Sequence, residues 1–570
     1  MMTKNNTKHN NERILLVLMP YWPPLIPPLG MACLKSFLQQ HGYRVKTVDT
    51  NTDDPLKNIY NNYLDILKTS IPENKRGNFY NIVNNVLQDH MMAYLHYENE
   101  AEYRELIKIV IRKHFLTDVE DRLFIKLHDT VKMLYKELEN YFLRLMENEK
   151  PTTLGFSVYR DTLPASMFAC KLAKEKYPYI KTVMGGAIFS QSLELQSPNL
   201  KYFLEKTDYV DKIIIGEGEN LFLRYLRSEL PGSQKVSSID DIHGQVLDVS
   251  TAVLPDFSDF TLDYYPYHAA YTSRSCPYEC SFCAETIYWG KYRKKSPQQV
   301  IQELNQLYEK YKTQLFLMCD SLLNPIITEL STELIKSGLI FYWDGYLRAD
   351  KQACNIEKTI HWRQAGFYRA RLGVESGSQS VLDSMGKRIT PALISSSIQN
   401  LALAGIKTTT YWIVGYPGET WEDFRETLKI IEEMKDYIYE AECNPFTYFL
   451  TGQAGSPDFA EKNKIIPLYP GETQDMLITR TWIIDGMPTR DETLERLNIF
   501  DEHCRKSGIP NPYSLHDIYM ADERWKNLHD NAVPPIIEFK NKNIVIDECR
   551  DVKKLTYIKN TAKDDGNFGF

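Results

Sequence analysis

Apolar and polar residues follow a spacing that changes along the chain from strand-like to helix-like and back. A buried-strand run, Arg13–Met19, precedes a helical stretch, Met31–His41, and a second strand-like run, Tyr43–Asp49. Strand, helix and strand at this spacing predict a βαβ unit and therefore a parallel sheet. The same rhythm resumes at Thr153 and continues to about residue 230, so both stretches are expected to form one doubly wound, Rossmann-like α/β domain.

Between these two stretches, from about residue 52 to residue 150, the apolar residues recur at helical spacing. Phe124, Leu127, Val131, Leu134 and Leu138 are an example. Three or four helices are expected here as an insertion in the α/β domain. Its aromatic residues and methionines fit core packing better than a binding site.

A second series of alternating strands and helices begins near Ala269 and predicts a partial (β/α) barrel. Functional residues of such a barrel lie at the carboxyl ends of its strands. The expected strands are Ala270–Ser273, Leu315–Met318, Phe341–Tyr346, Ala370–Val374 and Thr408–Val414, and two expected helices are Pro297–Tyr311 and Pro391–Ala404. The predicted domain limits are 1–12 for a disordered tail, 13–235 for the first α/β domain, 236–262 for a linker, 263–450 for the barrel and 451–570 for a mostly helical C-terminal extension.

Length and composition narrow the class of protein. The chain has 570 residues, 43% of them hydrophobic and 25% charged, which predicts two to four globular domains. The net charge of −8 disfavours a general nucleic-acid binder. No stretch resembles a secretory signal or a membrane span. Ten cysteines, mostly scattered, favour a cytoplasmic protein with one cofactor site over a disulfide framework.

The candidate chemistry lies in one segment, Arg274–Cys283, which reads RSCPYECSFC. Its cysteines, Cys276, Cys280 and Cys283, follow the first expected barrel strand at Cys-x-x-x-Cys-x-x-Cys spacing. Three thiolates can hold three irons of a cubane cluster and leave the fourth iron open. The alternative is a structural zinc site, which normally needs a fourth protein ligand, and no second Cys-x-x-Cys pair occurs.

This triplet, with an aromatic residue before its third cysteine, resembles the cluster motif of the radical S-adenosylmethionine (SAM) superfamily. Three later stretches resemble further motifs of that family in the expected order. They are Phe316–Pro325 (FLMCDSLLNP), Arg371–Gln379 (RLGVESGSQ) and Ile413–Glu419 (IVGYPGE).

The resemblance implies specific site residues. It makes Cys276, Cys280 and Cys283 the ligands of a 4Fe-4S cluster. It places the contacts to SAM at Phe282, Asp320, Arg348, Glu375, Ser376 and Glu419. The charged members of this set have an alternative interpretation as ion pairs at the rim of the barrel. The sequence assigns no catalytic residue.

The first α/β domain resembles the cobalamin-binding domain that precedes the barrel in one subclass of this family. Glycine-rich text at its strand ends carries the resemblance, and the implied contact residues are Ser157, Gly185, Gly186, Gly216 and Glu217. The loop Met19–Gly30 lacks the Asp-x-His-x-x-Gly sequence that supplies a histidine to cobalt in other cobalamin proteins. Cobalamin without a protein histidine ligand is therefore expected, and the alternative is a domain that keeps the fold and binds no corrinoid.

The resemblance implies a radical SAM enzyme that, with cobalamin, methylates an unactivated carbon or phosphorus of a natural-product, peptide or lipid substrate. One alternative is a cobalamin-associated radical cyclase, oxidase or ring-contracting enzyme without methyl transfer. The other is a corrinoid or iron–sulfur sensor. The expected partners are a small-molecule or peptide substrate and an electron donor such as flavodoxin or ferredoxin. Neither a membrane nor nucleic acid is expected as a partner.

Overall fold

The computed structural model describes residues 12–231, 234–469, 471–511 and 515–533. These residues form two compact units. The first consists of the chain up to Tyr265, Ile287–Gly290 and Tyr448–Asp485. The second consists of Pro266–Thr286, Lys291–Thr447 and the chain from Gly486 onward. Apart from Glu12, the tail expected over residues 1–12 lies outside the described residues.

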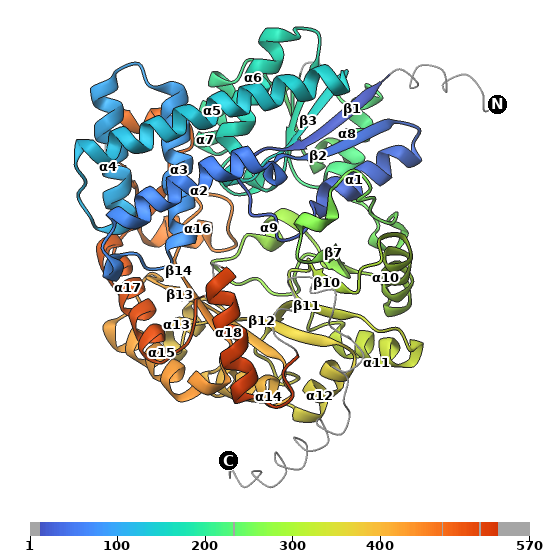
Figure 1. Ribbon diagram of the computed structural model, residues 1–570, viewed down its shortest axis with the longest axis vertical. Helices are drawn as coiled ribbons and strands as arrows, with labels where there is room; N and C mark the ends of the chain where they lie inside the picture. The colour runs from blue at the N-terminus through green and yellow to red at the C-terminus, as the bar shows by residue number, and fades with distance from the viewer. Residues whose placement is uncertain (1–11, 232–233, 470, 512–514, 534–570) are drawn as a thin grey trace, which may run out of the picture. The chain divides into compact units, whose positions relative to one another are not determined.

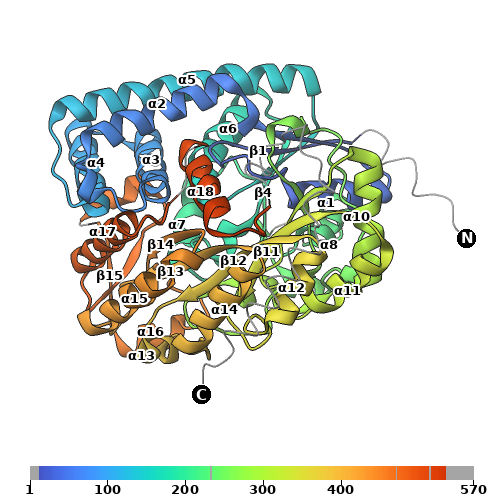
Figure 2. The same cartoon turned by 60° about the horizontal axis from the view of Figure 1, so that its bottom comes forward.

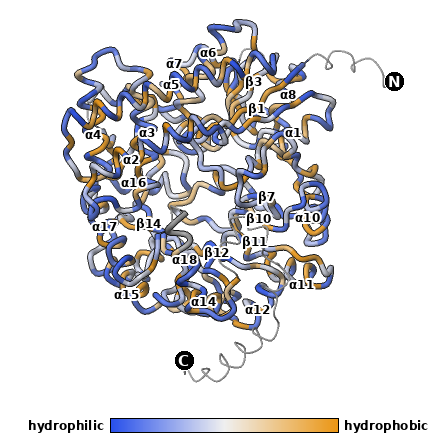
Figure 3. The backbone as a smooth tube through the Cα atoms, viewed as in Figure 1, coloured by the Kyte–Doolittle hydropathy of each residue, from blue (hydrophilic) through white to orange (hydrophobic). Residues whose placement is uncertain are grey.

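The first unit is built on a parallel sheet with the strand order β2-β1-β3-β4-β5-β6. Strands β2, β1 and β3 are labelled in Figure 1. Its strands are β1 (Arg13–Leu18), β2 (Arg44–Asp49), β3 (Thr153–Ser157), β4 (Lys181–Gly185), β5 (Lys212–Ile214) and β6 (Val236–Ser237). The helices that alternate with them are α1 (Leu29–Gln40), α6 (Leu163–Lys176), α7 (Pro198–Lys206) and α8 (Gly218–Leu226). Strand β1 is almost wholly hydrophobic (Figure 3) because both faces of a central parallel strand are buried. The doubly wound prediction is confirmed.

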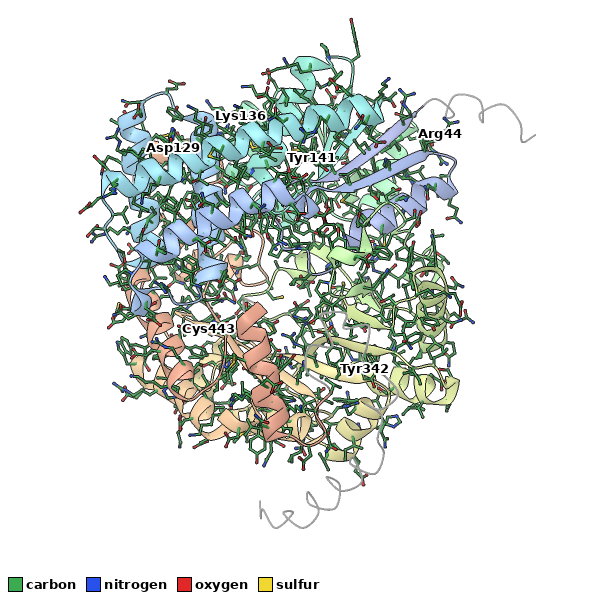
Figure 4. All side chains as sticks on the ribbon, in the orientation of Figure 1. Arg44, Asp129, Lys136, Tyr141, Tyr342 and Cys443 are labelled. Carbon is green, nitrogen blue, oxygen red and sulfur yellow. The ribbon has the colours of Figure 1, made fainter. Side chains whose placement is uncertain are left out.

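Four helices separate β2 from β3, and they confirm the expected helical insertion. They are α2 (Asp54–Ser70), α3 (Phe79–His96), α4 (Glu100–Phe115) and α5 (Asp121–Glu149). Helix α5 is amphipathic: Leu134 and Leu138 are buried, whereas Asp129 and Lys136, labelled in Figure 4, lie on its exposed face. The insertion therefore has a core of its own, as its helical spacing predicts.

The segment Tyr448–Asp485 packs with this first unit, although residues from 451 onward were expected to form a C-terminal extension after the barrel. It contains α16 (Ser456–Lys462) and an antiparallel pair, β15 (Lys464–Pro467) and β16 (Trp482–Asp485). The Tyr469 hydroxyl donates to Asp89 Oδ2 of α3 at 2.5 Å, and the Asn199 side chain pairs with the backbone of Arg480 at 3.0 Å in both directions. These long-range contacts leave no periodic signal in the sequence.

The second unit is a partial barrel of parallel strands in the order β14-β13-β12-β11-β10-β7, as predicted. Figure 2 labels four of these strands, β14, β13, β12 and β11. Its strands are β7 (His268–Ala270), β10 (Leu315–Met318), β11 (Tyr342–Arg348), β12 (Phe367–Glu375), β13 (Lys407–Val414) and β14 (Glu440–Pro445). Its helices include α10 (Pro297–Tyr311), α11 (Ile327–Ser337), α12 (Ile356–Gln364), α13 (Gln379–Ser384), α14 (Pro391–Leu403), α15 (Trp421–Met434), α17 (Arg490–Lys506) and α18 (Leu515–Leu528). No helix among the described residues combines the length and the apolar character needed to cross a membrane.

The expected strand Ala270–Ser273 is in fact two short strands. Strand β7 ends at Ala270, and β8 (Ser273–Arg274) pairs antiparallel with β9 (Arg293–Lys294). Between them, the Thr272 N–H donates to the carboxylate of Asp320 instead of to a neighbouring strand. The Asp320 carboxylate, which follows β10, therefore ends the hydrogen-bond ladder between β7 and β10. The alternation of apolar and polar residues in the sequence cannot indicate such a contact.

The chain after the barrel is fixed to β13 by a buried ion pair. Lys407 Nζ lies 2.6 Å from Asp522 Oδ1 of α18, and both side chains are almost fully buried. The same carboxylate oxygen accepts a hydrogen bond from the Tyr439 hydroxyl at 2.7 Å. Helix α18 is thus joined to two strands of the sheet through one carboxylate.

Asp522→Ala is expected to destabilise the second unit by about 3–5 kcal/mol, because it leaves the Lys407 ammonium buried without its carboxylate. Hydrogen exchange of the β13 amides would measure this loss. The matched control is Glu422→Ala, which removes an exposed ion pair with Arg425 and should change the exchange little. Equal protection in the two variants would contradict the prediction.

Candidate functional site

The cysteine loop follows β8 and is held by backbone and side-chain contacts from two other loops of the second unit. The Ser281 N–H donates to the Met385 carbonyl at 3.0 Å, and the Ser281 hydroxyl lies 2.7 Å from the Tyr416 hydroxyl. The Cys283 N–H donates to the Cys280 carbonyl at 3.0 Å, which closes a turn between the second and third cysteines. Cys280 is buried, and Cys276 and Cys283 are half-buried. The loop therefore has a defined path across the strand ends.

Burial makes these thiols difficult to ionise without a compensating positive charge. The pKa of Cys283 is raised to about 12, chiefly by burial and to a smaller extent by the neighbouring Cys280 and Cys276. Burial also raises the pKa of Cys276, which the cations Lys387 and Arg348 oppose. Iron supplies the positive charge that a thiolate ligand needs, so the donor set fits an iron–sulfur cluster.

Across the described residues, no three His, Cys, Asp or Glu side chains are placed to hold one metal ion. The ligands of a cubane cluster bind different irons, and their sulfurs do not converge on one point. The three cysteines therefore fit a cluster by residue type and by their common loop.

Arg348 lies against the cysteine loop. Its guanidinium Nη1 is 3.9 Å from Cys280 Sγ and its Cζ lies 4.1 Å from the centre of the Tyr278 ring. The side chain of Asn324 fixes the Arg348 backbone, donating to its carbonyl at 3.0 Å and accepting from its N–H at 2.8 Å. Within the described part of the chain, Arg348 thus faces a thiol and a phenol ring rather than a rim carboxylate.

Glu375 lies where β12 ends and forms a buried ion pair. Its Oε1 is 2.7 Å from Lys387 Nζ, and its backbone has φ +66°, so the strand stops there. Gly373 makes room for this pair, because a Cβ at that position would lie 2.8 Å from Glu375 Oε1. Lys387 Nζ also lies 5.6 Å from the ring centre of the half-buried Phe282. Glu375, Lys387 and Phe282 are therefore brought together beside the cysteine loop.

Lys387 was not predicted from the sequence. It follows the short helix α13 as a single lysine, and no motif or spacing distinguishes it from a solvated one. Its proximity to Glu375 is the only signal, and that proximity appears only in the fold.

Ser376, predicted as a cofactor contact, is fully buried and bonds to its own loop. Its hydroxyl accepts from the Ser378 N–H at 3.1 Å and lies 3.4 Å from the Thr427 hydroxyl. The Gly377 N–H donates to the same Thr427 hydroxyl at 2.8 Å. Ser376 therefore shapes the turn that follows Glu375.

Asp320, predicted as a SAM contact, accepts hydrogen bonds from neighbouring protein groups. Its carboxylate accepts from the Thr272 N–H at 2.9 Å, the Thr272 hydroxyl at 2.6 Å and the Ser273 hydroxyl at 2.5 Å. Burial raises the pKa of Asp320, and these donors oppose the shift. This carboxylate fixes the chain where it leaves β7 for the cysteine loop.

Glu419 holds the turn after β13. Its Oε2 accepts from the Gly415 N–H at 2.8 Å and from Arg496 Nη1 of α17 at 2.9 Å. Burial raises the pKa of Glu419 to about 7, which Gly415 and Arg496 partly oppose. Arg496 belongs to the expected C-terminal extension and was not predicted as part of the site. The pair positions Tyr416, which contacts Ser281 of the cysteine loop.

The five residues predicted to contact a corrinoid lie at three neighbouring strand ends of the first unit. Ser157 pairs with Gly185 where β3 and β4 end, and Gly216 and Glu217 lie between β5 and α8. Gly216 has φ +96° and open space where a Cβ would be. At Gly186, φ is +119° and a Cβ would lie 2.5 Å from the Val158 carbonyl oxygen. Gly216 therefore leaves room for a ligand, whereas the backbone of Val158 fills the space at Gly186.

One family model matches this chain. Residues 271–431 match the model described as the radical SAM superfamily. The matched segment contains the cysteine loop, Arg348, the Glu375–Lys387 pair and the Glu419 turn, and Arg496 lies beyond it.

Among the curated proteins that resemble this chain, two illustrate matches over about half of its length. An uncharacterized methyltransferase of Pyrococcus horikoshii is 23% identical over 325 residues, which are 53% of this chain and 69% of that protein. An anaerobic magnesium-protoporphyrin IX monomethyl ester cyclase of Rubrivivax gelatinosus is 26% identical over 359 residues, which are 57% of this chain and 63% of that protein. The chain thus spans about two thirds of each relative.

A solved structure has the same fold along nearly the whole chain. The radical SAM methyltransferase TsrM from Kitasatospora setae, with tryptophan substrate and a SAM analogue bound, matches with a TM-score of 0.59 and 13% identity. The match covers 97% of this chain and 100% of that chain. TsrM with cobalamin and a 4Fe-4S cluster bound gives a TM-score of 0.56. The likeness confirms the expected α/β architecture.

Arg348→Gln is expected to make the reduction potential of the reconstituted cluster more negative, by on the order of 50 mV. The variant removes a positive charge beside Cys280 Sγ, so an added electron is stabilised less. A redox titration followed by electron paramagnetic resonance would measure the shift, with the exposed Lys351→Gln as control. An unchanged reduction potential would show that the charge of Arg348 does not act on the cluster.

Glu375→Gln is expected to weaken SAM binding by about 1.5–3 kcal/mol while the cluster keeps its iron, because a charged hydrogen-bond acceptor is lost. Calorimetric titration of the anaerobic protein with SAM would test this. Glu422→Gln on exposed α15 is the matched control and should bind SAM like the parent chain. Equal affinity in both variants would leave Glu375 as a partner of Lys387 alone.

Proposed function

We propose that this chain, whose residues 271–431 match the radical SAM superfamily model, is a cobalamin-dependent enzyme that cleaves SAM reductively and methylates its substrate. The proposed target is an unactivated carbon or phosphorus of a natural product, peptide or lipid. The cysteine loop carries the proposal: three thiols at the spacing of the family motif lie beside two cations and an ion-paired carboxylate.

When bound, the cluster supplies the electron that cleaves SAM, and cobalamin supplies the methyl group for transfer. The protein supplies binding, orientation and exclusion of water. Cys276, Cys280 and Cys283 hold the cluster, Arg348 offsets their negative charge, and Phe282 limits access of water. Glu375 and Lys387 together offer an anion and a cation, which suit the amino and carboxylate groups of SAM.

The remaining residues that were predicted to contact SAM instead position other parts of the protein. Asp320 fixes the start of the cysteine loop, Ser376 fixes the turn after Glu375, and Glu419 fixes the turn that carries Tyr416. We propose these three as positioning residues, because their polar atoms are bonded to backbone or to neighbouring side chains.

The first unit is the proposed cobalamin site. The shared fold with TsrM, which has been solved with cobalamin bound, supports this assignment. The open space at Gly216, beside Ser157, Gly185 and Glu217, supports it from the chain itself. The name of the Pyrococcus horikoshii relative supports methyl transfer as the reaction.

A second candidate reaction is radical cyclisation or oxidation without methyl transfer. The Rubrivivax gelatinosus relative, named a cyclase, favours it. The radical SAM domain favours an enzyme of either kind over a sensor. In both cases we propose a cytoplasmic enzyme that takes electrons from a flavodoxin or ferredoxin and acts on a small molecule or peptide.

Anaerobic incubation with cobalamin, a reductant and SAM labelled in its methyl group tests the two reactions. We expect methylcobalamin that carries the label, detected by mass spectrometry of the protein-bound corrinoid. A variant with Cys276, Cys280 and Cys283 all changed to Ala is the control, and it should yield no 5′-deoxyadenosine. A chain that produces 5′-deoxyadenosine but takes up no corrinoid would contradict methylation and support the cyclase or oxidase.

A further inference from the structure

The strand order of the first unit creates an opening between β1 and β3. From β1 the chain passes through α1 to β2 on one side, whereas β3 lies on the other side of β1. The connections that leave β1 and β3 therefore diverge at the carboxyl edge of the sheet. In doubly wound sheets this switch point is where ligands bind.

Two aromatic rings meet at this switch point. Trp22 lies in the loop after β1 and Tyr159 lies in the loop after β3, and their rings stack with centroids 4.6 Å apart and 25° between planes. Trp22 is 38% exposed, while Tyr159 behind it is half-buried. An exposed indole backed by a second ring offers a flat apolar surface, which matches the shape of a planar macrocycle.

The loop that carries Trp22 is fixed to buried polar groups. The backbone N–H of Trp22 donates to Asn51 Oδ1 at 2.6 Å, and Asn51 Nδ2 donates to Asp49 Oδ1 at 2.7 Å. Asp49 Oδ2 accepts from the Tyr265 hydroxyl at 2.7 Å. Asn51 is almost fully buried, so this network holds the backbone of Trp22 through buried polar groups.

The helical insertion also contacts the same loop. The ring of Tyr21, next to Trp22, stacks on Tyr60 of α2 with centroids 3.3 Å apart. The two neighbouring aromatic side chains thus have separate roles: Tyr21 anchors the loop to the insertion, and Trp22 presents its ring at the switch point. A ring held in place before binding loses little conformational entropy when a ligand arrives.

We infer that Trp22, backed by Tyr159, is the surface on which the corrin ring of cobalamin rests. The inference depends on the cobalamin site of the proposed function and adds its positioning residue. The loop Met19–Gly30 contains no histidine, so an indole that cannot ligate cobalt occupies the place after β1. With cobalamin bound, Trp22 would shield the cobalt from water.

A flat ring at position 22 is needed to support a corrin ring, whereas ordinary packing needs only an apolar side chain. Two variants of the full chain distinguish these roles. Trp22→Phe keeps a flat ring, whereas Trp22→Leu keeps an apolar side chain without one. The expected result is that Trp22→Leu raises the dissociation constant for hydroxocobalamin roughly tenfold or more. Trp22→Phe should retain most of the affinity. Tyr179→Ala removes a fully exposed aromatic residue of the same unit and is the control.

A spectroscopic readout tests the axial face directly. In the parent chain, electron paramagnetic resonance of cob(II)alamin should show no nitrogen splitting from an axial ligand. Trp22→Leu should change the cobalt hyperfine pattern by admitting water, and Trp22→His should introduce nitrogen splitting. Trp22→Leu with unchanged affinity and an unchanged spectrum would overturn the inference and leave the proposed function standing.

Two other outcomes are distinct from that one. A parent chain that takes up no corrinoid at all would overturn both the cobalamin site and the role of Trp22. Uptake of flavin mononucleotide, lost in Trp22→Leu, without uptake of hydroxocobalamin would show a platform for a different planar ring and would also overturn the inference.

Discussion

The ion pair between Glu419 and Arg496 is the interaction on which the rest of the site depends. Glu419 also accepts the Gly415 N–H, so one buried carboxylate fixes the turn after β13 to a helix that lies 77 residues further along the chain. The turn positions Tyr416, whose hydroxyl meets Ser281 of the cysteine loop and donates to the Ser384 carbonyl at 2.9 Å. Tyr416 therefore connects the loops that follow β8, β12 and β13. These contacts help to position the cysteine loop.

Charge balance is the second constraint. A buried thiolate is unfavourable on its own, and two cations, Arg348 and Lys387, lie beside the loop that contains three thiols. Glu375 pairs with Lys387 and thereby keeps this cation at the mouth of the barrel rather than in solvent. The arrangement lowers the cost of assembling a negatively charged cluster, and it leaves an anion and a cation side by side where a zwitterion would bind.

Local patterns predicted the elements and missed the contacts between them. The bounds of β10 and α10 follow from the sequence because a buried apolar run defines the strand, while Ser296 caps a helix that begins with Pro297. The three cysteines are also visible because their spacing is local. The partners of Asp320, the Glu375–Lys387 pair and the attachment of Tyr448–Asp485 to the first unit join residues far apart in sequence. Periodicity carries no information on such pairs.

Gly186 and Trp22 are constrained for different reasons, the first by the fold and the second by a bound ligand. The missing side chain of Gly186 is required by the Val158 backbone, which any chain with this sheet must pack, whether or not a ligand is present. A descendant that lost its cofactor would keep this glycine, so glycines at this turn report the fold. The ring of Trp22 packs on Tyr159 but stays 38% exposed, and that exposed part is under no packing constraint once nothing rests on it. Among relatives, the residue after β1 is therefore the better marker of which chains still hold a macrocycle.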